Sequence, residues 1–198
     1  MKLLLASKSP RRWELLSTLG FPIEKVSIDV SETLAEPLPA DRVAEALAVL
    51  KSSAFSNDAI PDGAVLVTAD TVVVCDGAVL GKPRDRADAH RMLSMLRGRA
   101  HTVYTGVCLR SRSQKVAFTE ATEVHFRNLT DDELYYYIDT YRPSDKAGAY
   151  GIQEWIGMVG VEKIVGCYYN VMGLPVARLY EMLSSRFASS LTAPRSII

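Results

Sequence analysis

Apolar and polar positions along this 198-residue chain follow two alternating periods, which predict strands interleaved with helices. Apolar runs of strand length lie at residues 3–6, 21–29, 64–69, 71–75, 78–80, 101–110, 115–127 and 159–164. Helical spacing of apolar residues lies at residues 10–19, 41–55, 84–96, 134–140 and 175–187. Because the two periods alternate, the pattern predicts an α/β architecture.

Turn and cap signals divide these elements. Asp76-Gly77 predicts a hairpin turn, and Thr130 with Glu133 forms the pattern of a capping box. Residues 30–39 predict a loop. We expect a single domain over residues 1–187 and a disordered tail at 188–198, where no periodicity is left.

The segment from Ser7 to Arg12 stands between the first strand and the first helix. Ser9 followed by Pro10 predicts an N-cap with proline at the first helical position. Ser7, Arg11 and Arg12 add a hydroxyl and two guanidinium groups to the free N–H groups of that helix start. This combination is typical of a phosphate site, although a solvated helix start with its arginines in water has the same pattern.

The overall charge argues against some classes of partner. Lys plus Arg equals Asp plus Glu at 23 each, so no global field attracts nucleic acid or an anionic membrane. No apolar run reaches the length of a membrane span, and we find no signal-peptide pattern. The three cysteines are far apart and have no metal-ligand spacing, which predicts free thiols in a reducing cytoplasm.

Two carboxylates and two lysines are candidates for chemistry. Asp70 follows the apolar run 64–69, so we expect it at the carboxyl end of a buried strand, as a general base, a metal ligand or a turn residue. Lys51 is in line with the apolar face of its helix, where it extends into a site or along the core edge. Lys82, between Gly81 and Pro83, suits phosphate but also an ordinary surface turn. Glu32 lies in the polar loop 30–39.

Residues 144–153 form a second dense motif. Asp145 and Lys146 either contact a ligand or pair with each other. Gln153 ends the motif with an amide, which both donates and accepts hydrogen bonds and so suits the edge of a nucleobase. We interpret His101 and His125 as structural. The aromatic residues Tyr135, Tyr136, Tyr137 and Tyr141 are interpreted as helix packing.

Taken together, the motifs resemble the Maf family of nucleoside triphosphate pyrophosphatases. The matching segments are residues 7–12, 69–71, 81–83, 144–153 and 170–175. The resemblance implies a fold like that of inosine triphosphate pyrophosphatases, with a mixed twisted sheet flanked by helices and two lobes around a cleft. It also implies a homodimer, a divalent metal (Mg²⁺ or Mn²⁺) and hydrolysis of a nucleoside triphosphate to the monophosphate and pyrophosphate.

Within that family the chain is similar to the branch acting on dTTP and UTP. The resemblance implies that Arg12, Thr71 and Gln153 determine specificity and that Asp70 accepts a proton. Modified pyrimidine nucleotides remain open as substrates. The sister branch acting on 7-methyl-GTP is the second candidate, and a non-catalytic nucleotide-binding factor in septum formation is the candidate from another class.

The charges of the predicted site are of the right size for this substrate. A triphosphate brings roughly four negative charges and a metal ion two positive ones. Arg11, Arg12, Lys51 and Lys82 would add four positive charges, partly offset by Glu32 and Asp70. Glu32 and Asp70 are the candidate metal ligands, and Asp70 is the candidate base for the attacking water.

Overall fold

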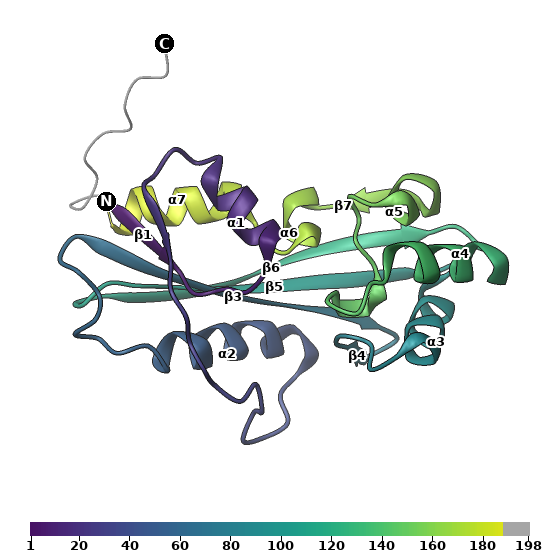
Figure 1. Cartoon of the computed structure of the whole chain (residues 1–198), viewed down its shortest axis with the longest axis horizontal. Coiled ribbons are helices and arrows are strands. Elements are labelled where there is room, and N and C mark those ends of the chain that lie inside the picture. Colours follow the sequence, from purple (N-terminus) through teal and green to yellow (C-terminus); the bar gives the residue numbers. More distant parts are fainter. Residues whose placement is uncertain (188–198) are drawn as a thin grey trace, which may run out of the picture. The chain divides into compact units, whose positions relative to one another are not determined.

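A computed structural model describes residues 1–187 and contains seven strands and seven α-helices in that part of the chain (Figure 1). The strands are β1 (Lys2–Leu5), β2 (Ile23–Lys25), β3 (Ala64–Cys75), β4 (Ala78–Leu80), β5 (Ala100–Arg110), β6 (Lys115–Phe126) and β7 (Val161–Val165). The helices are α1 (Pro10–Ser17), α2 (Ala40–Ser53), α3 (Arg86–Leu96), α4 (Asp131–Tyr141), α5 (Trp155–Gly160), α6 (Tyr168–Met172) and α7 (Val176–Arg186), with a 3-10 turn η1 at Ala147–Ala149.

The strands form one mixed sheet in the order β2-β1-β3-β5-β6-β7, with β4 paired to β3. β1 is parallel to both β2 and β3, whereas β4 is antiparallel to β3 and β7 is antiparallel to β6. This confirms the predicted α/β class with a mixed sheet.

The structure differs from the predicted elements in three respects. The strand expected at 21–29 is only three residues long, because β2 is an edge strand that pairs only with the short β1 and follows Pro22, which has no N–H. The helices α5 and α6 were not predicted, since five- and six-residue helices show almost no periodicity. β3 continues without interruption from Ala64 to Cys75, so the prediction that a strand ends before Asp70 is wrong.

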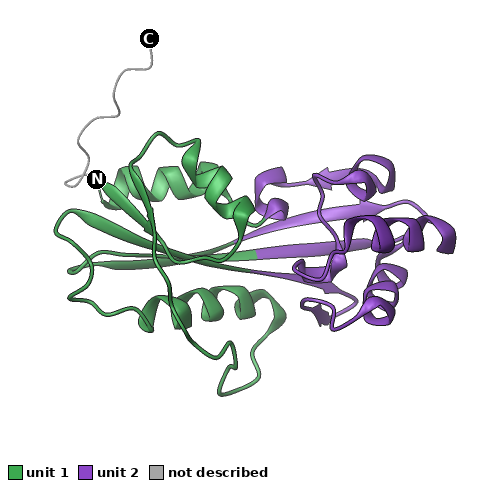
Figure 2. Cartoon of the chain, in the orientation of Figure 1, with its two compact units in different colours: residues 1–70, 105–119, 173–198 green, residues 71–104, 120–172 purple. Residues whose placement is uncertain are grey.

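The described chain divides into two compact units (Figure 2). Unit 1 comprises residues 1–70, residues 105–119 and the chain from residue 173 onward; unit 2 comprises residues 71–104 and 120–172. β3, β5 and β6 each contribute residues to both units. The single domain predicted over 1–187 stays a prediction, and the predicted tail at 188–198 lies outside the described residues.

Unit 1 buries both faces of β1 and of the first half of β3. Its core cluster joins Leu4, Ala6, Ile60, Ala64 and Leu66. In Figure 1, α2 lies on one face of this part of the sheet, and α1 and α7 lie on the other. The periodicity of 41–55 correctly predicts a buried Ala44 and Leu47, but Ala54 is exposed just beyond the end of α2.

Unit 2 has its own core around α3 and α4. Leu93, Phe126, Leu134 and Tyr137 belong to its cluster of buried side chains. The capping box predicted at the start of α4 is present: Thr130 and Glu133 bond to each other's backbone. No helix in residues 1–187 is both long and apolar enough to cross a membrane.

His101 is a buried histidine in the core of unit 2. It is 3 % exposed, its Nε2 lies 2.8 Å from the Tyr150 hydroxyl, and its ring meets the Phe126 ring edge-on. Burial lowers the pKa of His101 from 6.5 to about 4, with a smaller contribution from the nearby His125. The structural role predicted for His101 therefore fits its surroundings.

This histidine predicts acid sensitivity. Between pH 6.5 and 4, His101 is protonated in the unfolded chain but neutral in the folded protein. The free energy of unfolding therefore falls as the pH falls through that window. We expect a loss of about 2 kcal/mol between pH 7 and pH 5 from this group. Urea unfolding at both pH values measures it. His101→Gln should remove most of the loss while His125→Gln keeps it; equal losses in the wild type and His101→Gln would contradict the prediction.

Candidate active site

The turn from β1 into α1 is built as the sequence predicts. Pro10 begins α1, and the Ser9 hydroxyl accepts a hydrogen bond from the Arg12 N–H at 3.5 Å. The Ser9 N–H donates to the Ser7 hydroxyl at 3.2 Å. Both hydroxyls therefore fix the backbone at the helix start.

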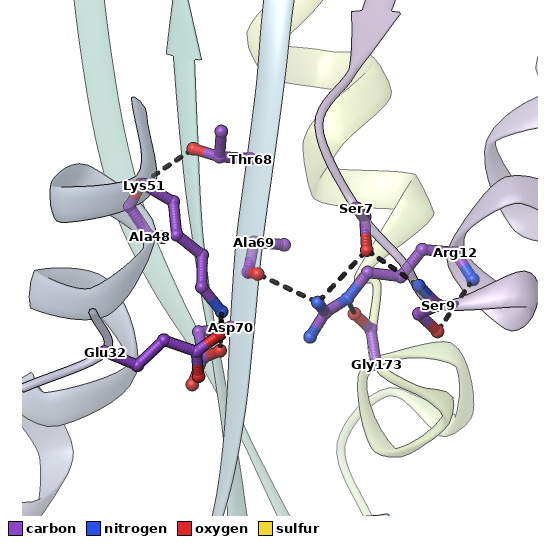
Figure 3. Close-up of polar contacts among 10 residues, drawn as sticks. All are labelled: Ser7, Ser9, Arg12, Glu32, Ala48, Lys51, Thr68, Ala69, Asp70 and Gly173. Atoms are coloured by element: carbon purple, nitrogen blue, oxygen red, sulfur yellow. Dashed lines mark hydrogen bonds and ion pairs between the residues drawn. The ribbon is translucent and has the colours of Figure 1, made fainter. Parts of the chain in front are cut away.

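The Arg12 guanidinium contacts the protein at several points (Figure 3). Its Nε donates to the Gly173 carbonyl at 2.8 Å, and its Nη1 donates to the Ala69 carbonyl at 2.8 Å and to the Ser7 hydroxyl at 3.5 Å. Burial lowers the pKa of Arg12, and the negative charge of Asp70 acts in the opposite direction. Arg12 thus joins the start of α1 to β3 and to the segment at Gly173, a function that the sequence did not indicate.

Lys51 lies between two carboxylates (Figure 3). Its Nζ forms an ion pair with Asp70 Oδ1 and lies 3.0 Å from Glu32 Oε1. The side chains of Lys51 and Asp70 are 11 % and 14 % exposed, whereas that of Glu32 is 53 % exposed. The Lys51 ammonium is therefore paired with both candidate acidic residues.

The position of Lys51 depends on how α2 meets β3. One turn before Lys51, the Ala48 carbonyl accepts a hydrogen bond from the buried Thr68 hydroxyl at 2.7 Å. Thr68 precedes Asp70 by two residues on the same strand. Because side chains alternate between the faces of a strand, Thr68 and Asp70 share one face, which brings Asp70 to the level of Lys51.

The carboxylates of Glu32 and Asp70 suit a divalent metal ion that is also coordinated by the phosphates of a substrate. Within residues 1–187, no three His, Cys, Asp or Glu side chains form a group that could hold a metal ion alone. Mg²⁺, however, commonly binds one or two carboxylates together with substrate phosphates. Glu32 and Asp70 both approach a single cation, the Lys51 ammonium. This pair of oxygen donors fits Mg²⁺ or Mn²⁺ in that shared mode.

In unit 2 the motif 144–153 forms a network of charges. Lys146 Nζ lies 2.7 Å from Asp145 Oδ1, as the pairing interpretation predicts, and 3.2 Å from Glu154 Oε1. The Lys146 side chain is only 9 % exposed, so two carboxylates balance a nearly buried charge. Gln153 is half-buried, and its Oε1 has no hydrogen-bond partner among residues 1–187.

Two predicted motifs of unit 2 meet at their backbones. The Gly148 N–H donates to the Gly81 carbonyl at 2.9 Å, which ties the residue before Lys82 to η1. Gly148 has φ +66°, and a Cβ there would lie 2.8 Å from a methyl group of Val73. Glycine is therefore required at this crossing. Lys82 itself is exposed and has no ion-pair partner within the described chain.

The structure thus groups the predicted residues by unit. In unit 1 it brings together Ser7, Arg12, Glu32, Lys51 and Asp70, with Arg11 half-buried beside Arg12 on α1. In unit 2 it brings together Asp145, Lys146, Gln153 and the Gly81–Lys82 backbone, and Thr71 is half-buried next to Asp70 on β3. The sequence reasoning did not predict that Glu154 and Tyr137 take part in the unit 2 network. A signal for Glu154 was present, because this carboxylate directly follows Gln153.

The fold is α/β with a mixed sheet, and the site holds a lysine between two carboxylates near a helix start that carries two arginines. These groups are the kind that enzymes of phosphate chemistry use. The family can be stated more narrowly. The family model described as Maf-like protein matches residues 2–186, and the chain belongs to this family. The predicted resemblance is therefore confirmed.

Relatives agree with this assignment, and a solved structure agrees with the fold. The chain is 50 % identical to a dTTP/UTP pyrophosphatase of Phocaeicola vulgatus, covering 92 % of this chain and 94 % of the relative. It is 48 % identical to a dTTP/UTP pyrophosphatase of Porphyromonas gingivalis, covering 92 % of each. The solved Ham1 protein of Staphylococcus aureus matches with a TM-score of 0.52 and 15 % identity over 91 % of this chain and 99 % of that one, which supports the fold.

Proposed function

We propose that this protein hydrolyses dTTP and UTP to the nucleoside monophosphates and pyrophosphate. Two relatives of about half-identical sequence bear the name of this activity. The observation in the molecule that carries the proposal is the Lys51 ammonium between the carboxylates of Asp70 and Glu32. The guanidinium of the half-buried Arg12 lies near Asp70 and adds a second positive charge. Cations and carboxylates at one place suit a reaction that needs both phosphate neutralisation and a proton acceptor.

Four residues that the structure brings together in unit 1 act in this proposal: Asp70, Lys51, Arg11 and Arg12. Asp70 accepts the proton of the water that attacks the α phosphorus, since it is a carboxylate held in place by Lys51. Lys51 and Arg11 neutralise phosphate charge. Arg12 contributes charge to the same place while its donors to Ala69 and Gly173 hold the strand of Asp70.

Glu32 and Asp70 would hold the Mg²⁺ or Mn²⁺ ion that the family implies. When bound, the ion supplies positive charge against a triphosphate that carries roughly four negative charges. The Lys51 ammonium already balances one of the two carboxylates. Lys82, Asp145 and Lys146 remain proposed substrate contacts. Of the two lysines, Lys146 is paired with Asp145 and Glu154, whereas Lys82 is exposed and has no ion-pair partner within residues 1–187.

For the base, we assign recognition to Gln153, with Thr71 and Arg12 as the other specificity positions. Thymine and uracil present an N3–H donor between two carbonyl acceptors, whereas cytosine presents an acceptor at N3. The buried Gln153 Oε1, which lacks a partner within residues 1–187, can accept from that N3–H. An amide also donates through its Nε2, so Gln153 matches two neighbouring groups of the preferred bases.

Gln153→Ala should erode discrimination between bases. We expect the ratio of kcat/KM for dTTP over dCTP to fall about tenfold, because a buried hydrogen bond to the base is lost. Gln114→Ala, in the turn between β5 and β6, is the matched control and should keep the ratio. An unchanged ratio in Gln153→Ala would reject the base-recognition assignment.

A substrate panel tests the function itself. Purified protein is incubated with Mg²⁺ and dTTP, UTP, dCTP, CTP, dATP, dGTP or 7-methyl-GTP, and the nucleoside monophosphate and pyrophosphate are separated by ion-exchange chromatography. We expect dTTP and UTP to be cleaved fastest and EDTA to stop cleavage. Fastest cleavage of 7-methyl-GTP would move the protein to the sister branch, and binding without any turnover would favour the non-catalytic alternative.

The remaining expectations concern the protein in its cell. We propose a homodimer, which sedimentation velocity of the full chain would test. We also propose a cytoplasmic location, where nucleoside triphosphates are present and where the free thiols of Cys75, Cys108 and Cys167 would stay reduced.

A further inference from the structure

Gln153 lies in a tight turn whose ends are Gly151 and Glu154. The Glu154 N–H donates to the Gly151 carbonyl at 3.0 Å, which closes the turn. The flanking side chains of Tyr150 and Ile152 are buried, whereas Gln153 is half-buried. The direction of the Gln153 amide therefore depends on how this turn is held.

Both ends of the turn bond to one phenol. Tyr137 is fully buried on α4, and its hydroxyl accepts a hydrogen bond from the Gly151 N–H at 3.0 Å. The same hydroxyl donates to Glu154 Oε2. One oxygen atom thus links the first residue of the turn to the last. Packing of the ring alone would be served equally well by phenylalanine, so the hydroxyl has a separate purpose.

The Glu154 carboxylate carries the bracing further. Its Oε1 lies 3.2 Å from Lys146 Nζ, and Lys146 is paired with Asp145. The ion pair between Lys146 and Glu154 therefore joins the two ends of the segment 146–154, and Tyr137 holds Glu154 from α4. Hydrogen bonds to a carboxylate are stronger than those between neutral groups, which suits a brace.

The helix that presents Tyr137 is itself well fixed. Thr130 and Glu133 cap its start, and Arg127 Nη2 donates to Glu133 Oε1 at 2.6 Å. The Tyr137 ring stacks on that of Tyr141 with centroids 5.2 Å apart. The Gln153 and Glu154 side chains also lie close to the first residue of the turn, since a Cβ at Gly151 would lie 2.9 Å from both Gln153 Nε2 and Glu154 Cδ.

We propose that Tyr137, acting through Gly151 and Glu154, is a positioning residue that fixes the turn of Gln153 and thereby sets base selectivity. The selectivity half of this statement rests on the proposed function. Tyr137 touches no substrate in this proposal. Its removal alters the direction of the Gln153 amide, not the groups around Asp70 that perform the chemistry.

The test is Tyr137→Phe, with Tyr136→Phe as the matched control. Tyr136 is the neighbouring residue on α4, is 50 % exposed and packs its ring against Trp155, a contact that phenylalanine keeps. Amide hydrogen exchange of the segment 147–158 is measured first. We expect at least tenfold faster exchange in this segment for Tyr137→Phe and no change for Tyr136→Phe. Unchanged exchange would overturn the positioning role, whatever the activity.

Steady-state kinetics on dTTP and dCTP supply the second measurement. For Tyr137→Phe we expect KM for dTTP to rise about tenfold, kcat to change less than threefold, and the preference for dTTP over dCTP to fall. A parallel loss of kcat on both nucleotides, or an unaltered preference, would overturn the role in selectivity. Glu154→Gln, which keeps the side-chain size, is expected to give the same pattern and replaces Tyr137→Phe if that variant fails to fold.

The two measurements separate this inference from the proposed function. If the wild type cleaves no nucleoside triphosphate, the proposed function and the role in selectivity both fail, while exchange still decides whether Tyr137 holds the turn. If the wild type cleaves dTTP but Tyr137→Phe retains its exchange rates and its preference, only the present inference fails.

Discussion

Asp70→Asn is expected to lower the rate of pyrophosphate release from dTTP by at least about a thousandfold. Asparagine has the same shape but cannot accept the proton of the attacking water, and a positioned general base is worth 10²- to 10⁴-fold. The substitution also removes one of the two carboxylates that fit the metal ion. Both losses act on the same step, so we place the effect in the upper part of that range.

The fold should survive this substitution. Lys51 keeps Glu32 as a partner at 3.0 Å, and the asparagine amide fits the space of the carboxylate. Thermal unfolding and kinetics are measured on Asp70→Asn and on Asp76→Asn. Asp76 is a matched control because it lies on the same hairpin and pairs with Arg99, and its side chain is 69 % exposed. Activity of Asp70→Asn within tenfold of the wild type would refute the assignment of Asp70 as the base.

Local sequence signals correctly predicted where elements begin and turn. At such places the conformation depends on residues only a few positions apart. Ser9 with Pro10, and Thr130 with Glu133, cap α1 and α4 as their spacing indicates. The Asp76-Gly77 hairpin likewise joins β3 to β4. Such signals act within four residues, so tertiary packing does not need to be known.

The contacts of the site were less accessible to sequence reasoning. Helical periodicity placed Lys51 on the apolar face, but nothing in it indicated that Glu32, from a loop without periodicity, would pair with the same ammonium. Arg12 was expected to face phosphate, yet it donates to the carbonyls of Ala69 and Gly173. Backbone carbonyls are the same at every residue, so no sequence pattern identifies such acceptors.

Tyr137 illustrates the same limit from within a helix. Its spacing predicted packing, and its ring is indeed fully buried. The hydrogen bonds of its hydroxyl to Gly151 and Glu154 depend on a turn that follows 14 residues later. Periodicity indicates which face of a helix is buried but not what its polar atoms meet there.

The close approach of α2 to the sheet leads to a second large expected effect, that of Gly106→Ala on stability. Gly106 lies on β5 directly under α2. A Cβ at this position would lie 2.3 Å from the carbonyl carbon of Ala44 and 2.4 Å from its oxygen. Real side chains do not approach backbone this closely, so either the helix or the strand must move by about an ångström.

That movement is opposed by contacts on both sides of the clash. The Thr119 hydroxyl donates to Glu45 Oε2 at 2.9 Å, and the Thr68 hydroxyl donates to the Ala48 carbonyl at 2.7 Å. Both hydrogen bonds join α2 to strands of unit 1 and would be strained or broken. We therefore expect Gly106→Ala to lower the free energy of unfolding by about 4 kcal/mol, above the common range for overpacking.

Urea unfolding of Gly106→Ala and Gly81→Ala measures this effect. Gly81 has no atom within 4 Å of an added Cβ and has no positive φ, so its substitution should change the free energy of unfolding by less than about 1 kcal/mol. Activity offers an independent check, because α2 also carries Lys51, two turns beyond Ala44. The fraction of Gly106→Ala that stays folded should hydrolyse dTTP more slowly than the wild type, since a displaced helix moves the ammonium away from Asp70. A stable Gly106→Ala variant with full activity would mean that α2 can shift on the sheet without disturbing the ion pairs of Lys51.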